Sequence, residues 1–196
     1  MSEVVTDDEI ARLGDEGAFV RDGWLGAGRA EAIAAALEGL RPSLRPAGVG
    51  RGGVVDRAVR GDRIALVDPG EAPSLAALFA ALDEVAAACA RAACLTLVGC
   101  TRQVALFPGD GTGYARHRDA FRGGAPGPIR RLTTIYYPNL GWRDAEGGAL
   151  RLALPSGERD LLPVADRLVV FLSERLEHEV LPAFRARWAV TAWYVG

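Results

Sequence analysis

Residues 101–120 read TRQVALFPGDGTGYARHRDA, in which two runs of β-forming residues flank the turn sequence PGDG. Six more short runs follow, separated by turn-forming sequences such as GGAPGP, AEGG and PSGE. These runs occupy residues 131–138, 148–154, 159–164, 167–172, 178–183 and 187–195. Short strands at close spacing with tight turns are typical of an antiparallel sandwich or jelly roll. We therefore predict such a fold for the part of the chain after residue 100.

Helix-forming sequence dominates the first 95 residues. The run TDDEIARL begins at Thr6, an N-cap residue followed by acids in the first turn. Residues 27–40 and 74–95 are rich in alanine and leucine at helical spacing, and Ser74 is expected to open the second run. The second helix is apolar enough to lie against a sheet.

The segments around these helices are expected to be extended or irregular. Residues 17–26 are predicted to form a short extended piece, and residues 62–68 (DRIALVD) alternate like a strand. The glycine-, proline- and arginine-rich residues 41–61 favour a long loop or an irregular hairpin. No repeat or linker divides the chain, so we expect one α+β domain, 1–196, whose N-terminal helices cover one sheet from outside.

Composition argues against several classes of protein. With 49% hydrophobic and 24% charged residues and a net charge of −2, the chain has no electrostatic basis for binding nucleic acid. No run approaches about 18 consecutive apolar residues and the N-terminus is acidic, so we expect neither a membrane span nor a signal peptide. Cys89, Cys94 and Cys100 lack a partner sequence for a zinc site and are expected to be reduced, partly buried thiols of a cytoplasmic protein.

The chain contains two histidines, His117 and His178, and both lie in its β-rich part. Residues i and i+2 of a strand point to the same face, so His117 and Asp119 are predicted to aim at one point. With His178 they would form two imidazoles and one carboxylate, the arrangement of non-haem Fe(II) oxygenases. His-x-Asp alone is a weak signal, because a lone histidine is more often a structural residue than a metal ligand.

Arg187 lies nine residues after His178, with Pro182 between them. An unbroken strand would place the two side chains on opposite faces, so we expect two neighbouring strands joined by a turn. In the second strand Arg187, Thr191 and Trp193 share a face. If that face is interior, the buried guanidinium needs an anion, and no acid in the strand provides one. The sequence therefore predicts a carboxylate ligand from outside the chain, beside the metal.

Four segments together resemble a known family. They are FPGDGTGYARHRDAF, TTIYYPN, GGALRL and HEVLPAFRARWAVTAWY. They are similar to the Fe(II)/2-oxoglutarate-dependent dioxygenases, and most of all to prolyl hydroxylases of the hypoxia-sensing and bacterial type. The resemblance covers roughly residues 55–195 and includes VRGDRI at 59–64, a substrate-side loop motif of that subgroup. It implies a double-stranded β-helix (jelly-roll, cupin-like) core at about 96–196, supported by helices and a substrate-side loop at about 1–95.

The resemblance also implies roles for individual residues. His117, Asp119 and His178 would hold Fe(II). Arg187 would pair with the distal carboxylate of 2-oxoglutarate, and Tyr137 would donate a hydrogen bond to the same end. The walls of the cosubstrate pocket would be Thr191, Ile135 and Leu150.

Further residues are implied around the metal and on the substrate side. Trp193 would pack nearer the metal, Tyr114 would lie at the mouth of the site, and Phe107 stands where relatives often have tyrosine. The substrate-side residues would be Arg60, Asp62 and Arg130. Two further departures from the family pattern concern the substrate: Ala65 stands where an aromatic is common, and residues 119–131 (DAFRGGAPGPIRR) are longer than the matching turn.

The expected reaction is hydroxylation of a substrate C–H bond, using O2 and converting 2-oxoglutarate into succinate and CO2. The resemblance implies L-ascorbic acid (vitamin C) as a candidate reductant. The carboxylate of Asp119 occupies a position that halogenating relatives leave open for chloride, which favours hydroxylation.

The expected substrate is a prolyl residue in a flexible, proline-containing protein or peptide. The long loop at 41–63 favours a peptide, because such loops clamp extended chains, although this loop could also be a solvated surface. The alternatives are a hydroxylase of a free amino acid or small metabolite, and a non-catalytic jelly-roll binding protein, against which the intact triad argues. Only one of Tyr136 and Tyr137 can face inward.

Overall fold

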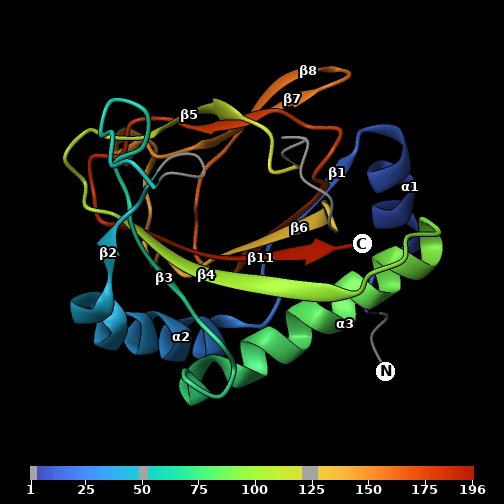
Figure 1. The fold of residues 1–196 in the computed structure, drawn as a ribbon, viewed down its shortest axis with the longest axis horizontal. Coiled ribbons are helices and arrows are strands. Elements are labelled where there is room, and N and C mark those ends of the chain that lie inside the picture. The colour runs from blue at the N-terminus through green and yellow to red at the C-terminus, as the bar shows by residue number, and fades with distance from the viewer. Residues whose placement is uncertain (1–3, 49–52, 121–127) are drawn as a thin grey trace.

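The computed structural model describes residues 4–48, 53–120 and 128–196. Two antiparallel sheets lie face to face, and helices cover the outer face of the larger sheet (Figure 1). The helices are α1 (Asp7–Asp15), α2 (Ala27–Leu40) and α3 (Ala76–Ala92). This arrangement confirms the predicted jelly roll with N-terminal helices outside one sheet.

The larger sheet has seven strands and the smaller sheet has four. In spatial order the larger sheet contains β1 (Ala18–Arg21), β9 (Arg167–Leu172), β6 (Arg130–Tyr137), β11 (Arg187–Val195), β4 (Gly99–Phe107), β3 (Arg63–Leu66) and β2 (Arg45–Pro46). The smaller sheet contains β5 (Tyr114–His117), β10 (His178–Val180), β7 (Leu150–Leu154) and β8 (Gly157–Leu161). Three short 3-10 turns complete the described elements: Arg41–Ser43, Pro73–Leu75 and Asp144–Glu146.

Helix α1 begins where the sequence predicts. The Thr6 hydroxyl accepts a hydrogen bond from the Glu9 backbone N–H, and the Glu9 carboxylate accepts one from the Thr6 backbone N–H at 2.9 Å. Glu9 also accepts a hydrogen bond from Arg21 Nε at 2.7 Å. This ion pair ties the helix to strand β1.

Helix α3 begins at Ala76, after the 3-10 turn Pro73–Leu75, and Ser74 makes no capping hydrogen bond. The prediction that Ser74 caps the helix is wrong, because Pro73 already occupies the first position of a turn that leads directly into it. The apolar face of α3, formed by Leu78, Phe79, Leu82 and Val85, is buried in a core with the larger sheet.

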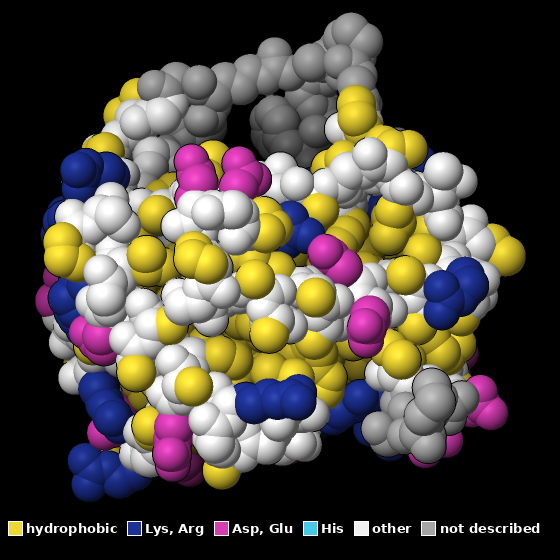
Figure 2. Space-filling view, turned by 90° about the horizontal axis from the view of Figure 1, so that it is seen from below, with side chains coloured by type: hydrophobic (Ala, Val, Ile, Leu, Met, Phe, Trp, Pro, Cys, Tyr) yellow, Lys and Arg dark blue, Asp and Glu magenta, His cyan; other side chains and the backbone are white. Residues whose placement is uncertain are grey.

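Within the described parts of the chain, the stretch Pro73–Ala92 is long and apolar enough to span a membrane by length and composition, with a mean hydropathy of 1.4. Asp83, Glu84 and Arg91 interrupt this helix, so it is not an unbroken apolar run, and the expectation of no membrane span stays a prediction. One side of this helix packs on the larger sheet, where its Asp83 accepts hydrogen bonds from Arg102 and Tyr194. Figure 2 shows the helical side of the molecule, with apolar side chains spread between scattered charged groups.

Strand β11 divides its side chains between two apolar layers. Trp188, Val190, Ala192 and Tyr194 pack in the core between the larger sheet and the helices. Arg187 and the alternate residues after it face the space between the sheets. The prediction that Arg187, Thr191 and Trp193 share a face agrees with this alternation.

Adjacent tyrosines of β6 also point in opposite directions. Tyr136 belongs to the helix-side core and donates a hydrogen bond to Asp166 at 3.2 Å, whereas Tyr137 belongs to the core between the sheets. The sequence predicts a long loop or an irregular hairpin at residues 41–61, and β2 within that range pairs with β3, which lies in the predicted strand 62–68. Residues 49–52 lie outside the described residues.

Three details of the sequence analysis need correction. Strand β5 ends at His117, so Asp119 lies beyond it and strand periodicity does not set its direction. His178 and Arg187 lie in strands of different sheets, because the connection after β10 crosses the sandwich. Among the free thiols, Cys94 is exposed; only Cys89 and Cys100 are buried or partly buried, and burial raises their pKa values to about 12 and about 11.

Candidate metal centre

His117, Asp119 and His178 converge between the sheets. His117 ends β5, His178 begins β10, and the two residues are direct partners in the antiparallel ladder. Their Nε2 atoms lie 3.9 and 3.8 Å from Asp119 Oδ1, and one ligand atom from each residue lies within 4.8 Å of the others. The strand pairing therefore brings together two residues from distant parts of the chain.

The Asp119 carboxylate is held by its second oxygen. Thr133 Oγ1 donates a hydrogen bond to Asp119 Oδ2 at 2.8 Å, and Ser173 Oγ lies 2.8 Å from Thr133 Oγ1. Since the Thr133 hydrogen goes to the carboxylate, Ser173 must donate to Thr133. Thr133 and Ser173 are fully buried, so this pair fixes the carboxylate and leaves Oδ1 for a metal.

The two imidazoles present one nitrogen each to the same point. His117 Nδ1 lies 2.8 Å from the Ala115 carbonyl, which can only accept, so Nδ1 carries the hydrogen and Nε2 keeps its lone pair. His178 Nδ1 is buried with no hydrogen-bond partner in the described part of the chain. Two imidazole nitrogens and one carboxylate oxygen are the donor set of a non-haem Fe(II) facial triad. The residues therefore fit Fe(II).

The protonation states suit metal binding as well. Burial lowers the pKa of His117 to about 4, helped by the neighbouring His178, so the imidazole is neutral at pH 7. Burial alone would raise the pKa of Asp119, but His178, the Thr133 hydrogen bond and Arg130 together lower it. A neutral imidazole and an ionised carboxylate are the forms that coordinate a metal.

Arg187 is buried with an exposed fraction of 1%. Its Nε donates to the Gly148 carbonyl at 2.7 Å and its Nη2 donates to Tyr137 Oη at 3.2 Å. Its guanidinium carbon lies 4.9 Å from the centre of the Tyr137 ring and 5.2 Å from that of Phe107. No carboxylate of the described residues pairs with it, so the guanidinium is ringed by aromatic and backbone groups and lacks an anion.

One pocket of about 670 Å³ contains both the triad and Arg187. It is lined by every residue that the sequence predicts for the site. Apart from the triad and Arg187 these are Tyr137, Thr191, Ile135, Leu150, Trp193, Tyr114, Phe107, Arg60, Asp62 and Arg130.

Arg60 and Asp62 form a two-pronged ion pair at one side of the pocket. Nε and Nη2 of Arg60 lie 2.6 and 2.9 Å from the two oxygens of Asp62. The Arg60 guanidinium lies over the Tyr114 ring at 4.6 Å, and that ring stacks on His117 at 3.8 Å. The pair therefore fixes the ring that covers a metal-site imidazole.

Arg130 lies closer to the triad than its predicted place on the substrate side implies. Its guanidinium carbon is 3.8 Å from the centre of the Trp193 ring, and Nη1 is 3.8 Å from Asp119 Oδ1. Burial lowers the pKa of Arg130, and the Asp119 charge opposes that effect. By its sequence, the turn at residues 119–131 is longer than the matching turn of the family that the chain resembles. Residues 121–127 of that turn lie outside the described residues.

Sequence reasoning missed Thr133 and Ser173, which support Asp119, and Gln103, which lines the pocket. Thr133 shares a face of β6 with Ile135, and Gln103 shares a face of β4 with Phe107, so strand periodicity could have found both. Ser173 follows the end of β9, and no local signal indicates its contact with Thr133.

Comparison with known proteins agrees with this geometry. The family model described as 2OG-Fe(II) oxygenase superfamily matches residues 102–195. The human prolyl hydroxylase EGLN3 is 37% identical over 154 residues, covering 74% of this chain and 62% of that protein. Human Egl nine homolog 1 is 38% identical over 147 residues, covering 69% of this chain and 33% of that protein. The chain thus spans less than two thirds of the length of these curated relatives.

Solved structures match over nearly the whole chain. A prolyl-4-hydroxylase of Pseudomonas putida superposes with a TM-score of 0.84 and 35% identity, covering 96% of this chain and 97% of that one. A Trichoplax adhaerens prolyl hydroxylase, solved with a peptide fragment of the hypoxia inducible factor oxygen degradation domain, superposes with a TM-score of 0.85. Its identity is 30%, and the match covers 95% of this chain and 87% of that one.

Proposed function

The chain belongs to the 2OG-Fe(II) oxygenase superfamily, in its prolyl hydroxylase subgroup, and we propose that it hydroxylates a prolyl residue of a protein or peptide. The reaction would consume O2 and 2-oxoglutarate and release succinate and CO2. One observation supports this proposal above all: Arg187, which is buried and has no acidic partner in the part of the chain that the structure describes, shares a pocket with two histidines and an aspartate.

His117, Asp119 and His178 would hold Fe(II), which when bound supplies the activation of O2 and the coupled oxidation of 2-oxoglutarate. The chain supplies positions and charges around it. Thr133 holds Asp119 Oδ2, so the carboxylate keeps one orientation. The Tyr114 ring stacks on His117 and limits the movement of that imidazole.

Arg187 and Tyr137 would bind the distal carboxylate of 2-oxoglutarate. An arginine has five N–H donors, and Arg187 gives one to Gly148 and one to Tyr137, so three remain for an anion. Because the Tyr137 oxygen accepts from Arg187, its own hydrogen is free to reach the same anion. Thr191, Ile135 and Leu150 line the same pocket and would exclude water from the ion pair.

A peptide substrate is supported by the prolyl hydroxylase named in the Trichoplax complex, which was solved with a peptide fragment. It is also supported by the ordered pair of Arg60 and Asp62, which lines the pocket beside Tyr114. Three expectations stay predictions. They are that L-ascorbic acid acts as the reductant, that the protein is located in the cytoplasm, and that residues 1–196 form a single domain.

The test is anaerobic loading with Fe(II) and 2-oxoglutarate, followed by exposure to O2 and measurement of succinate and hydroxyproline. Proline-containing peptides should raise succinate release well above the rate without substrate, and free proline or other amino acids should not. Arg187→Ala should abolish the stimulation. Arg185→Ala is the matched control, because Arg185 is exposed and bonds to the carbonyls of Leu140 and Gly141.

Greater stimulation by free amino acids than by peptides would replace the proposal with a small-molecule hydroxylase. Absence of any succinate would favour the non-catalytic binding protein.

A further inference from the structure

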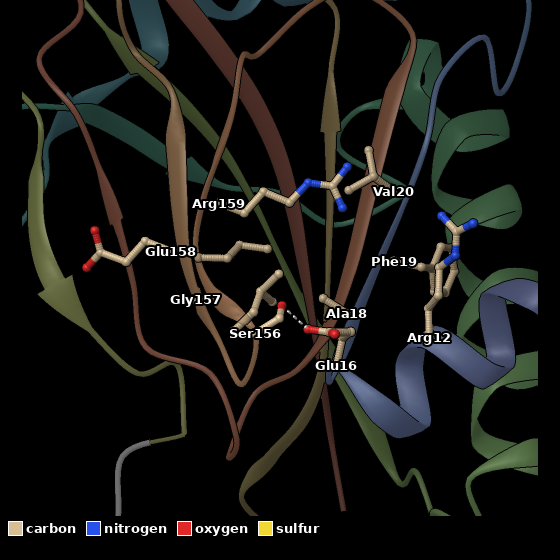
Figure 3. A pocket seen from close by; sticks show the side chains of 11 residues that line it. Arg12, Glu16, Ala18, Phe19, Val20, Ser156, Gly157, Glu158 and Arg159 are labelled. Carbon is tan, nitrogen blue, oxygen red and sulfur yellow. Dashed lines mark hydrogen bonds between the residues drawn. The ribbon is translucent and has the colours of Figure 1, made fainter.

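A second pocket of about 470 Å³ lies between strand β1 and the hairpin formed by β7 and β8, next to the end of α1 (Figure 3). None of the residues that line it lines the pocket of the metal centre. Its volume falls within the range of about 300–1,000 Å³ that is usual for ligand sites. The proposed oxygenase activity does not use it.

The floor of this pocket is the margin of the core between the two sheets. Ala18 and Leu152 are buried members of that core, while Val20 and Leu154 pack against it and stay partly exposed. The apolar layer is therefore incompletely covered on this side of the sandwich. An apolar occupant would bury this surface.

Both strands that border the pocket are edge strands. β1 is the last strand of the larger sheet, where it pairs with β9, and β8 is the last strand of the smaller sheet, where it pairs with β7. On the other side of each, no further strand pairs with it in the described part of the chain. An edge strand presents backbone N–H and C=O groups that an extended chain can pair with.

Two arginines face the pocket from its opposite walls, Arg12 on α1 and Arg159 on β8 (Figure 3). Leu161 of β8 is buried in the core between the sheets, so Arg159, two residues earlier, points to the same inner side. Neither guanidinium forms a hydrogen bond or an ion pair within residues 4–48, 53–120 and 128–196.

The acids near these arginines already have other partners. Glu16 accepts a hydrogen bond from Ser156 at 2.7 Å, which closes one end of the pocket (Figure 3). Glu158 pairs with Arg116. Both oxygens of Asp22 accept hydrogen bonds from Arg167, at 2.6 and 2.8 Å, and these bonds lower the pKa of Asp22, with a smaller contribution from the charge of Arg159. Ser156 is neutral, so Glu16 keeps its negative charge, and the pocket holds that carboxylate and two arginines that have no acidic hydrogen-bond partner among the described residues, over an apolar floor.

We propose that this pocket docks an extended acidic segment of a partner protein. The segment adds as a strand along the free edge of β8, and its acidic side chains reach Arg12 and Arg159. Because the side chains of a strand alternate between its faces, the acidic side chains are the ones that point inward, and their CH2 groups cover Val20 and Leu154. β8 has five residues, so the paired segment would be about 17 Å long at roughly 3.4 Å per residue.

The test uses ¹⁵N-labelled protein and the peptide acetyl-Val-Glu-Val-Glu-Val-amide. Amide shifts should change at residues 157–161 and 18–21 and not at the metal centre. The peptide acetyl-Val-Lys-Val-Lys-Val-amide should bind at least tenfold more weakly. Because each exposed ion pair contributes about twofold to fivefold to affinity, the double variant Arg12→Glu/Arg159→Glu should lose tenfold or more.

The matched control is Arg29→Glu/Arg91→Glu, which changes the net charge equally on exposed positions of α2 and α3. It should bind the acidic peptide as the unmodified protein does. Loss of binding in this control would mean that general charge, and not the pocket, attracts the peptide, and would overturn the proposal.

Three other results would also overturn it. The acidic peptide could fail to shift the β8 amides at millimolar concentration. Succinate could bind there as tightly as the peptide, which would indicate a site for small carboxylates only. Arg159→Ala could make the protein self-associate without changing peptide affinity, in which case the arginine only guards an edge strand against pairing.

Discussion

Arg187 and Arg60 both line the pocket of the metal centre and differ in what surrounds their charge. Arg60 finds its carboxylate two residues away, in Asp62, and the pair is closed within the protein. Arg187 is more deeply buried, and its partners among the described residues are a carbonyl, a phenol and two aromatic rings. A buried arginine with an internal acid orients its neighbours, whereas one without an acid marks the place of an anionic ligand.

The largest effect should come from removing the arginine that has no internal partner. Arg187→Ala would leave the carboxylate of bound 2-oxoglutarate buried and unpaired, which typically costs about 3–5 kcal/mol. Affinity for 2-oxoglutarate should therefore fall roughly a hundredfold to a few thousandfold. Titration into anaerobic Fe(II) protein, followed by the metal-to-ligand charge-transfer band, measures this.

Two variants sharpen this result. Arg187→Lys keeps the charge without the planar fork and should lose less affinity. The affinity for Fe(II) without 2-oxoglutarate should barely change, and the unfolding free energy of the ligand-free Arg187→Met protein should stay level or rise, because an unpaired buried charge is removed. Unchanged 2-oxoglutarate affinity in Arg187→Ala would rule out the cosubstrate role.

Asp119 is a buried anion of the same pocket, and a hydrogen bond from Thr133 holds one of its oxygens. Thr133→Val removes the hydrogen bond that holds Asp119 Oδ2 and keeps nearly the same shape. Loss of such a supporting bond typically weakens metal binding about 10- to 100-fold. Anaerobic calorimetry with Fe(II) or Co(II) should show this loss, and Thr133→Ser should restore most of the affinity. Equal affinities in all three proteins would mean that Asp119 needs no such support.

Breaking the ion pair between Arg60 and Asp62 should lower the stability of the fold and leave the affinity for 2-oxoglutarate unchanged. Asp62→Ala leaves Arg60 without its acid, although the Arg60 side chain is 12% exposed and keeps some access to water. The unfolding free energy should therefore fall by about 1–2 kcal/mol in urea denaturation, while affinity for 2-oxoglutarate stays within about twofold. A large loss of 2-oxoglutarate affinity would contradict the distinction between the two arginines.

The smallest effect concerns a third arginine, Arg21, which pairs with Glu9. Burial would raise the pKa of Glu9, but hydrogen bonds from Arg21 and Thr6 outweigh it and the pKa is lowered. A lowered folded-state pKa contributes stability above the unfolded value, near 4.3, which is lost as pH falls through the folded value. When the pH is lowered from 5 to 3, the unfolding free energy should fall less in Glu9→Gln than in the unmodified protein. The two decreases should differ by under about 1 kcal/mol.

Local sequence signals predicted much of the fold and the ligands of the site. Thr6 and Glu9 cap α1 because the capping box is a contact within four residues. Alternation predicted the faces of β11, and Arg187 stood out because nothing nearby in the sequence could balance a buried charge. The N-cap prediction at Ser74 failed, because a 3-10 turn that begins at Pro73 leads directly into α3.

By itself, the sequence determined which residues could bind a metal and an anion, since two histidines and one unbalanced arginine left few choices. Only the tertiary structure decided that His117 pairs with His178, that Asp119 lies beside both of them, and that Thr133 and Ser173 support it. The physical reason is register. Which residues face each other across strands far apart in the chain depends on the packing of whole sheets, which no local pattern contains.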